Sequence, residues 1–118
     1  PSTCGSPEKL ENTKIIGLKR SIGASIEYTC PDGYMLIGSK SRTCENNGFW
    51  SERPPTCKFV DCGSLPEIDN GQVILVNNRT THGAFADYVC KENYTLIGDA
   101  KRRCGDGGIW SGHQPQCL

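Results

Sequence analysis

Eight cysteines divide the 118-residue chain into two runs of almost the same spacing. The first run is Cys4, Cys30, Cys44 and Cys57, and the second is Cys62, Cys90, Cys104 and Cys117. The first cysteines of the two runs are 58 residues apart and the other three pairs are 60 apart, so the runs differ in length only within their first interval. The chain is therefore a tandem repeat, and each copy must fold from about half of the sequence.

Other residues recur at the same distances from these cysteines. Residues 30–38 of the first copy match residues 90–98 of the second, and residues 48–51 match 108–111. The matched positions include Tyr28 and Tyr88, Tyr34 and Tyr94, Gly38 and Gly98, Trp50 and Trp110, and Pro55 and Pro115. Both halves are therefore copies of one module.

Four cysteines, a Gly-Tyr after the second, a Gly-x-Trp between the third and fourth, and a proline before the last resemble the sushi, or complement control protein, modules. The resemblance covers almost the whole chain. It implies an all-β fold of two small disulfide-stapled β-sandwich modules in an elongated tandem. We expect module 1 at residues 1–57, a short linker at 58–61 and module 2 at 62–118. The disulfides implied by the resemblance are Cys4–Cys44, Cys30–Cys57, Cys62–Cys104 and Cys90–Cys117.

Independently of the family, modules this small bury too little surface to be stable by core packing alone and are usually cross-linked. Four cysteines per module allow three pairings, which the residues alone do not separate. In the chain-entropy model, each disulfide that the resemblance implies stabilises the folded state by roughly 3.5–4 kcal/mol, because it closes a loop in the unfolded chain. Disulfide-dense modules belong to oxidising compartments, so we expect an extracellular protein, either secreted or the ectodomain of a membrane protein.

A metal site is not expected, because structural zinc uses closely spaced pairs such as Cys-x-x-Cys, whereas the nearest cysteines here, Cys57 and Cys62, are five apart. No signal peptide precedes Pro1, and the longest apolar run, residues 73–76, is too short to cross a bilayer. The chain begins and ends close to framework cysteines, and we expect it to be a mature segment of a longer protein.

Apolar and polar residues alternate with the period of strands. Ile26, Tyr28 and Cys30 alternate with polar neighbours, and the second copy repeats this pattern up to Tyr88 and Cys90. Clusters of Gly, Pro, Asn and Asp separate these short segments. Trp50 and Trp110, each between two framework cysteines, are expected to join Tyr28 and Tyr88 in the cores rather than to bind a partner.

The copies differ where module 1 has Gly33 and module 2 has Asn93. Asn tolerates a positive φ better than most residues, so a left-handed turn would accept either. The change creates the sequon Asn93-Tyr94-Thr95, and a second sequon begins at Asn78. We expect both asparagines to be candidate N-glycosylation sites, with Asn78 in an accessible loop.

Charge does not indicate a polyanionic partner. The chain carries 13 basic and 13 acidic residues, so neither nucleic acid nor a glycosaminoglycan is the expected ligand, although two basic clusters keep a glycosaminoglycan as an alternative. Both clusters are interpreted as solvated charges. They are Lys14, Lys19 and Arg20, and Lys101, Arg102 and Arg103.

Catalysis and a cofactor are not expected. The cysteines are assigned to disulfides, and the two histidines, His82 and His113, both lie in module 2. The segment Ser111-Gly112-His113 is a weak hydrolase signal, because its counterpart Ser51-Glu52-Arg53 lacks the histidine. No phosphate loop or dinucleotide fingerprint is present.

We therefore expect a non-catalytic, extracellular protein-recognition segment of a complement or immune regulator, a receptor, or an adhesion or synaptic protein. The alternatives are the accessory region of a modular serine protease in an immune cascade, and a passive spacer. Phe59 and Val60 in the short linker are expected to pack between the modules. Candidate partner contacts lie in the first-interval loops, at Lys14, Lys19, Arg20, Asn77, Arg79 and His82.

Overall fold

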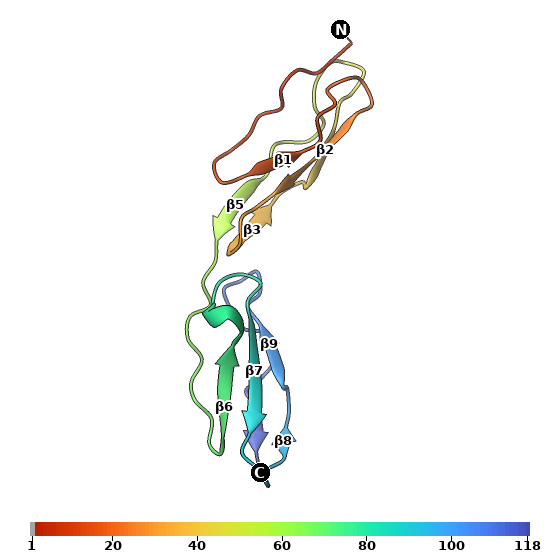
Figure 1. Ribbon diagram of the computed structural model, residues 1–118. Coiled ribbons are helices and arrows are strands. Elements are labelled where there is room, and N and C mark those ends of the chain that lie inside the picture. The colour runs from red at the N-terminus through yellow and green to blue at the C-terminus, as the bar shows by residue number, and fades with distance from the viewer. Residues whose placement is uncertain (1) are drawn as a thin grey trace. The chain divides into compact units, whose positions relative to one another are not determined.

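A computed structural model of the protein describes residues 2–118. The chain divides into two compact units, the first ending at Lys58 and the second beginning at Phe59 (Figure 1). This division falls inside the segment 58–61 that the sequence suggests as a linker. Each unit is built from short strands, and one 3-10 turn, η1 (Val76–Asn78), is the only helical element among the described residues.

Unit 1 packs a three-stranded antiparallel sheet against a two-stranded one. The first sheet has the order β1-β2-β4, with β1 at Lys14–Ile16, β2 at Ser25–Thr29 and β4 at Ser41–Thr43. The second sheet pairs β3 (Tyr34–Ile37) with β5 (Thr56–Phe59).

Unit 2 repeats this topology, with two longer strands in its three-stranded sheet and two shorter strands in its second sheet. Its three-stranded sheet has the order β6-β7-β9, with β6 at Gly71–Leu75, β7 at Phe85–Cys90 and β9 at Lys101–Arg103. Its second sheet pairs β8 (Leu96–Ile97) with β10 (Gln116–Cys117). The prediction of two small, disulfide-stapled β-sandwich units is therefore confirmed.

The alternating sequence pattern determines which side of each sheet is buried. Along β2, Ile26 and Tyr28 are buried and the residues between them are exposed, because successive strand residues point to opposite faces. In β7, Ala86 and Tyr88 take the same positions. The turn after the second cysteine has positive φ in both units, 88° at Gly33 and 72° at Asn93, which is the conformation that glycine and asparagine tolerate best.

Each unit buries one tryptophan, and in unit 1 this residue belongs to the hydrophobic core. In unit 1, Trp50 is buried beside Ile26 and Tyr28, and its Nε1 donates a 3.1 Å hydrogen bond to the carbonyl of Gly5. In unit 2, Trp110 is buried and its Nε1 donates a 3.0 Å hydrogen bond to the carbonyl of Gly63. In each unit the indole therefore fills buried volume, and its hydrogen bond holds the residue that follows the first cysteine.

Two disulfides close opposite ends of the three-stranded sheet in each unit. Cys44, just after β4, bonds to Cys4, and Cys30, just after β2, bonds to Cys57. The corresponding bonds of unit 2 are Cys62–Cys104 and Cys90–Cys117. The sulfurs are part of the cores, since Cys44 and Cys104 are almost fully buried.

No helix within residues 2–118 has the length and apolar character needed to cross a bilayer.

We predict that Trp50→Ala lowers the free energy of unfolding of unit 1 by about 3–5 kcal/mol, because truncating a large buried aromatic leaves a cavity. Amide hydrogen exchange followed by mass spectrometry would show loss of protection in β2, with β7 of the other unit as an internal reference. Phe49→Ala is the matched control: Phe49 is adjacent but 71% exposed, and we expect a change within about 0.5 kcal/mol. Equal protection of β2 in the two variants would contradict the assignment of Trp50 to the core.

Candidate functional site

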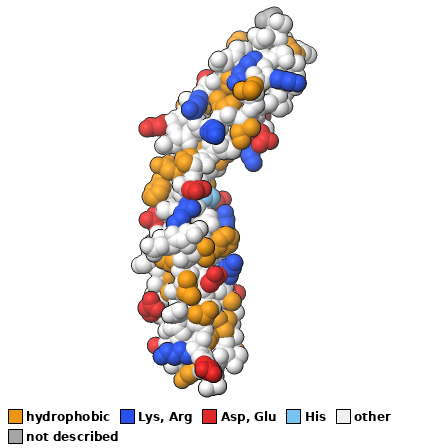
Figure 2. All heavy atoms as spheres, in the orientation of Figure 1, with side chains coloured by type: hydrophobic (Ala, Val, Ile, Leu, Met, Phe, Trp, Pro, Cys, Tyr) orange, Lys and Arg blue, Asp and Glu red, His pale blue; other side chains and the backbone are white. Residues whose placement is uncertain are grey.

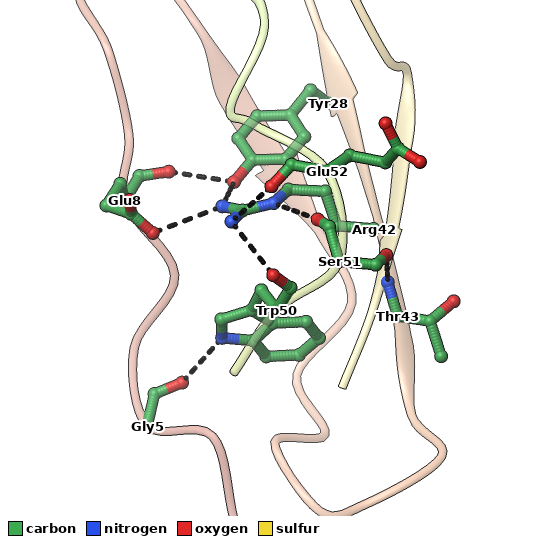
Figure 3. Close-up of polar contacts among 8 residues, drawn as sticks. All are labelled: Gly5, Glu8, Tyr28, Arg42, Thr43, Trp50, Ser51 and Glu52. Carbon is green, nitrogen blue, oxygen red and sulfur yellow. Dashed lines mark hydrogen bonds and ion pairs between the residues drawn. The ribbon is translucent and has the colours of Figure 1, made fainter. Parts of the chain in front are cut away.

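A buried arginine organises the polar interior of unit 1. Arg42 lies in the middle of β4 with only 4% of its surface exposed, and its guanidinium meets the carboxylate of Glu8 at 3.2 Å (Figure 3). It also donates to the hydroxyl of Tyr28 at 3.2 Å and to the carbonyl of Ser51 at 2.8 Å. Further bonds reach the carbonyls of Trp50 and Glu52. All of these acceptors are satisfied by one side chain.

This network connects four parts of unit 1 that are distant in sequence. The Tyr28 hydroxyl, on β2, donates a 2.7 Å hydrogen bond to the carbonyl of Glu8, so the N-terminal segment is held twice (Figure 3). Arg42 then ties that segment to the chain that follows Trp50. A buried charge is tolerated only when it is paired and hydrogen-bonded, and both conditions are met here. The role of this cluster is therefore to hold distant segments of unit 1 together.

Unit 2 has a reduced version of the same network. Arg102, on β9, donates to the carbonyl of Ser111 at 2.8 Å and to the hydroxyl of Tyr88 at 3.3 Å, and it is half-buried. The interpretation of Lys101 to Arg103 as solvated charges is therefore wrong for Arg102. The sequence contained a signal for this role, since Arg42 and Arg102 each stand two residues before the third cysteine.

Two exposed carboxyl groups are held in their charged form. The pKa of Glu8 lies below its ordinary value of 4.5. The main cause is a hydrogen bond from the backbone amide of Glu8 itself, followed by the hydrogen bond and the positive charge of Arg42. The backbone amide of Gly63, followed by the hydroxyl of Thr80, lowers the pKa of Asp61 below 3.8. Both groups therefore stabilise the fold while they are ionised.

The histidines and serine considered for catalysis do not form a catalytic set. The Ser111 hydroxyl accepts a 2.9 Å hydrogen bond from the amide of Arg103, and the amide of His113 donates to Asp99 at 2.8 Å. His82 Nε2 lies 2.7 Å from Asp106 Oδ1. Within residues 2–118, no hydrogen bond joins a histidine ring to a serine hydroxyl, and no three His, Cys, Asp or Glu side chains gather as metal ligands would.

The basic residues of the first interval in unit 1 lie partly in a strand and partly in a loop. Lys14 begins β1 and is exposed, which differs from its expected loop position. Lys19 is exposed in the loop that follows. Arg20 is half-buried, because its guanidinium donates to the carbonyls of Gly17 and Lys19 and closes that loop. Lys14 and Lys19 are thus the accessible charges of this set.

The corresponding segment of unit 2 joins β6 to β7. Asn77 is exposed within η1 and has a φ of 57°. Arg79 is half-buried and donates to the Thr81 hydroxyl at 3.2 Å. His82 is half-buried against Asp106. Most of these polar groups are therefore held by the fold, and Asn77 projects from it.

Both sequon asparagines are exposed, and they lie at opposite ends of one strand pair. Asn78 follows the end of β6 and Asn93 follows the end of β7. Because β6 and β7 are antiparallel, their ends point in opposite directions. Attached glycans would leave the sheet at its two ends and not from its middle.

The two apolar residues near the junction have different environments. Phe59 ends β5 and is 53% exposed, whereas Val60 is 7% exposed. The carbonyl of Val60 accepts a hydrogen bond from the amide of His82 at 2.9 Å, and the next residue, Asp61, bridges Thr81. Val60 therefore belongs to the fold of unit 2.

Comparison with known proteins places both units in one family of repeats. The family model described as Sushi repeat (SCR repeat) matches residues 4–57 and 62–117. The sushi, von Willebrand factor type A, EGF and pentraxin domain-containing protein 1 of Rattus norvegicus is 35% identical over 117 residues, which is 99% of this chain and 3% of that protein.

Two further relatives are shorter matches. Complement factor H of Bos taurus is 32% identical over 107 residues, covering 86% of this chain and 9% of its own length. Clotting factor C of Tachypleus tridentatus is 34% identical over 103 residues, covering 81% of this chain and 10% of its own length. The chain spans a small fraction of each of these relatives.

The two arginines provide a matched pair for testing the buried network. We predict that Arg42→Ala lowers the free energy of unfolding of unit 1 by about 3 kcal/mol. The buried Tyr28 hydroxyl and Trp50 carbonyl lose their donor at roughly 1–3 kcal/mol each, whereas water can reach the partly buried carbonyls of Ser51 and Glu52. Arg102→Ala should lower that of unit 2 by about 1 kcal/mol, since Arg102 is less buried and makes fewer bonds. Hydrogen exchange of β2 and β7 would measure both, and equal losses would contradict the central role assigned to Arg42.

The lowered pKa of Glu8 predicts how stability depends on pH. A carboxyl whose pKa is lower in the folded state contributes stability above its ordinary pKa, and that contribution disappears as pH falls through the folded value. Between pH 5 and about pH 3 we therefore expect Glu8→Gln to lose less thermal stability than the unchanged protein. Calorimetry of the full chain would measure this, with the exposed Glu11→Gln as a control that keeps the original slope. Parallel curves for Glu8→Gln and the unchanged protein would refute the role of this carboxylate.

Proposed function

The chain belongs to the sushi repeat family, and on that basis we propose that it is a non-catalytic recognition segment of a larger secreted or cell-surface protein. Sushi repeats serve in protein–protein recognition outside the cell, and the modules themselves are not catalytic. Four disulfides and no free cysteine among the described residues suit that compartment.

One observation carries this proposal. The two units bury the same kinds of residue at the same positions, including Tyr28 and Tyr88, and Trp50 and Trp110. Several exposed residues at matched strand positions differ, among them Ser25 and Phe85, and Thr43 and Arg103. A constant core with variable surface residues suits recognition, because surface residues can change without disturbing the core. Its partner is therefore proposed to be an extracellular protein, of the complement or immune, receptor, or adhesion type.

We place partner contacts in the first-interval segments, at Lys14, Lys19, Arg20, Asn77, Arg79 and His82. Lys14, Lys19 and Asn77 offer exposed side chains, whereas Arg20, Arg79 and His82 support the loops that hold them. We also propose Asn78 and Asn93 as N-glycan carriers.

A second candidate function is the accessory region of a modular protease. The likeness to clotting factor C over 81% of this chain favours it, because that name describes a protein of a clotting system. In that case the catalytic activity would belong to another domain of the parent protein. A passive spacer is the third candidate, and it predicts that exchange for an unrelated pair of sushi modules leaves the parent's activity unchanged.

The proposal is tested with the full chain, secreted from eukaryotic cells and applied to an array of purified extracellular domains. We expect at least one saturable protein binder. Lys14→Ser with Lys19→Ser, or Asn77→Gly alone, should weaken it about 3–10-fold, as expected for contacts at the rim of an interface. Lys9→Ser, also exposed, is the matched control. An array without any binder would refute recognition by this segment and favour the spacer.

A further inference from the structure

The outward side of the three-stranded sheet in unit 2 is unusually apolar. We call it the β7 face, and it consists of the side chains that alternate away from the core on β6, β7 and β9. Its seven members are Gln72, Ile74, Phe85, Asp87, Val89, Lys101 and Arg103. Figure 2 shows hydrophobic side chains mixed with basic and acidic ones over this part of unit 2.

Unit 1 provides an internal reference for this surface. Its strands pair in the same register, since Lys14 opposes Thr29 as Gln72 opposes Val89, and Ser25 opposes Thr43 as Phe85 opposes Arg103. The equivalent face therefore consists of Lys14, Ile16, Ser25, Glu27, Thr29, Ser41 and Thr43. Only Ile16 among these seven is apolar, and the hydroxyls of Ser25 and Thr43 lie 3.2 Å apart.

The apolar residues of the β7 face are costly to leave in water. Ile74, Phe85 and Val89 are 43%, 38% and 44% exposed, and they lie on neighbouring strands. A sheet with one side in water normally alternates apolar residues inside with polar residues outside, as unit 1 does at every outward position but Ile16. The fold does not need Phe85 and Val89 outside, because the same module forms with Ser25 and Thr29 at their positions, whereas Ile74 corresponds to the exposed Ile16 of unit 1.

The charges on the β7 face are arranged around the apolar residues. The Lys101 ammonium is 5.0 Å from the centre of the Phe85 ring and 3.8 Å from Asp87 Oδ1, so it is held between a ring and a carboxylate. Arg103 directly opposes Phe85 in the ladder, and its guanidinium lies above Gly83. The structure shows no ion pair for Arg103 within the described residues, which leaves one unmatched cation on the face.

We propose that the β7 face is a docking surface for an extracellular protein that presents a carboxylate flanked by apolar side chains. The carboxylate pairs with Arg103, whose planar fork suits two parallel hydrogen bonds. The partner's apolar groups cover Phe85, Val89 and Ile74. This inference rests on the proposed function and adds the surface and the chemistry of the partner.

The composition of the β7 face favours a protein over an acidic polysaccharide. A polyanion is held by several unpaired cations, but Lys101 is already paired with Asp87. Apolar side chains surrounding a bidentate arginine are instead typical of the centre of a protein interface. The candidate glycan carriers, Asn78 and Asn93, follow opposite ends of the β6–β7 pair, so glycans there would flank this face.

The test exchanges the faces of the two units. Phe85→Ser, Val89→Thr and Arg103→Thr together give unit 2 the residues that unit 1 uses at those positions, so the variant keeps choices that the module already tolerates. We expect it to bind the array proteins at least 30-fold more weakly, with unchanged thermal unfolding. The single variant Arg103→Gln should reduce binding about 10-fold and should also reduce its dependence on salt.

The reciprocal exchange tests whether the face alone is sufficient. Ser25→Phe, Thr29→Val and Thr43→Arg, added to the triple variant of unit 2, should recover at least a tenth of the original affinity. Unchanged binding by the triple variant would overturn the proposal for the β7 face and leave the recognition function standing. Capture of the chain by heparin that is lost in the triple variant, without any protein binder, would assign the face to a polysaccharide and also overturn the proposal.

Discussion

Two disulfides at opposite ends of a short sheet are the constraint on which each unit depends. Strands of two to six residues and a handful of buried side chains would not hold a chain of this length together by packing alone. Cys4–Cys44 and Cys30–Cys57 close the two ends of the unit 1 sandwich, and their sulfurs replace part of the missing core. Every other feature, including the Trp50 core and the Arg42 network, is built between these two closures.

The buried arginine shows how little redundancy such a core has. Arg42 serves acceptors on the N-terminal segment, on β2 and on the chain after Trp50, so one side chain satisfies groups that a larger protein would satisfy with separate elements. Arg102 carries out a smaller version of the same task. The frame therefore has few positions that can change, and variation is concentrated outside it. The β7 face, with Phe85 and Arg103 where unit 1 has Ser25 and Thr43, is the clearest example.

Much of the fold could be predicted because the cysteine spacing and the alternation around Tyr28 and Tyr88 are local patterns in the sequence. The burial of Arg42 and the partial burial of Arg102 could not be predicted, although both stand at the same distance from the third cysteine, because a charged residue between polar neighbours usually indicates a solvated strand. Lys14 was expected in a loop and lies in β1, since the pairing of β1 with β2 depends on a partner strand distant in sequence.

The sequence by itself determined the doubled module, its β class and its cysteine framework, because these follow from residue identities at fixed spacings. The tertiary structure decided which polar groups are buried and which apolar groups are exposed. Strand register brings Phe85 opposite Arg103 and places Lys101 beside Asp87, and the sequence does not encode these neighbours locally. Burial and register arise from pairing between distant strands, so the surface proposed for recognition became visible only once the chain was folded.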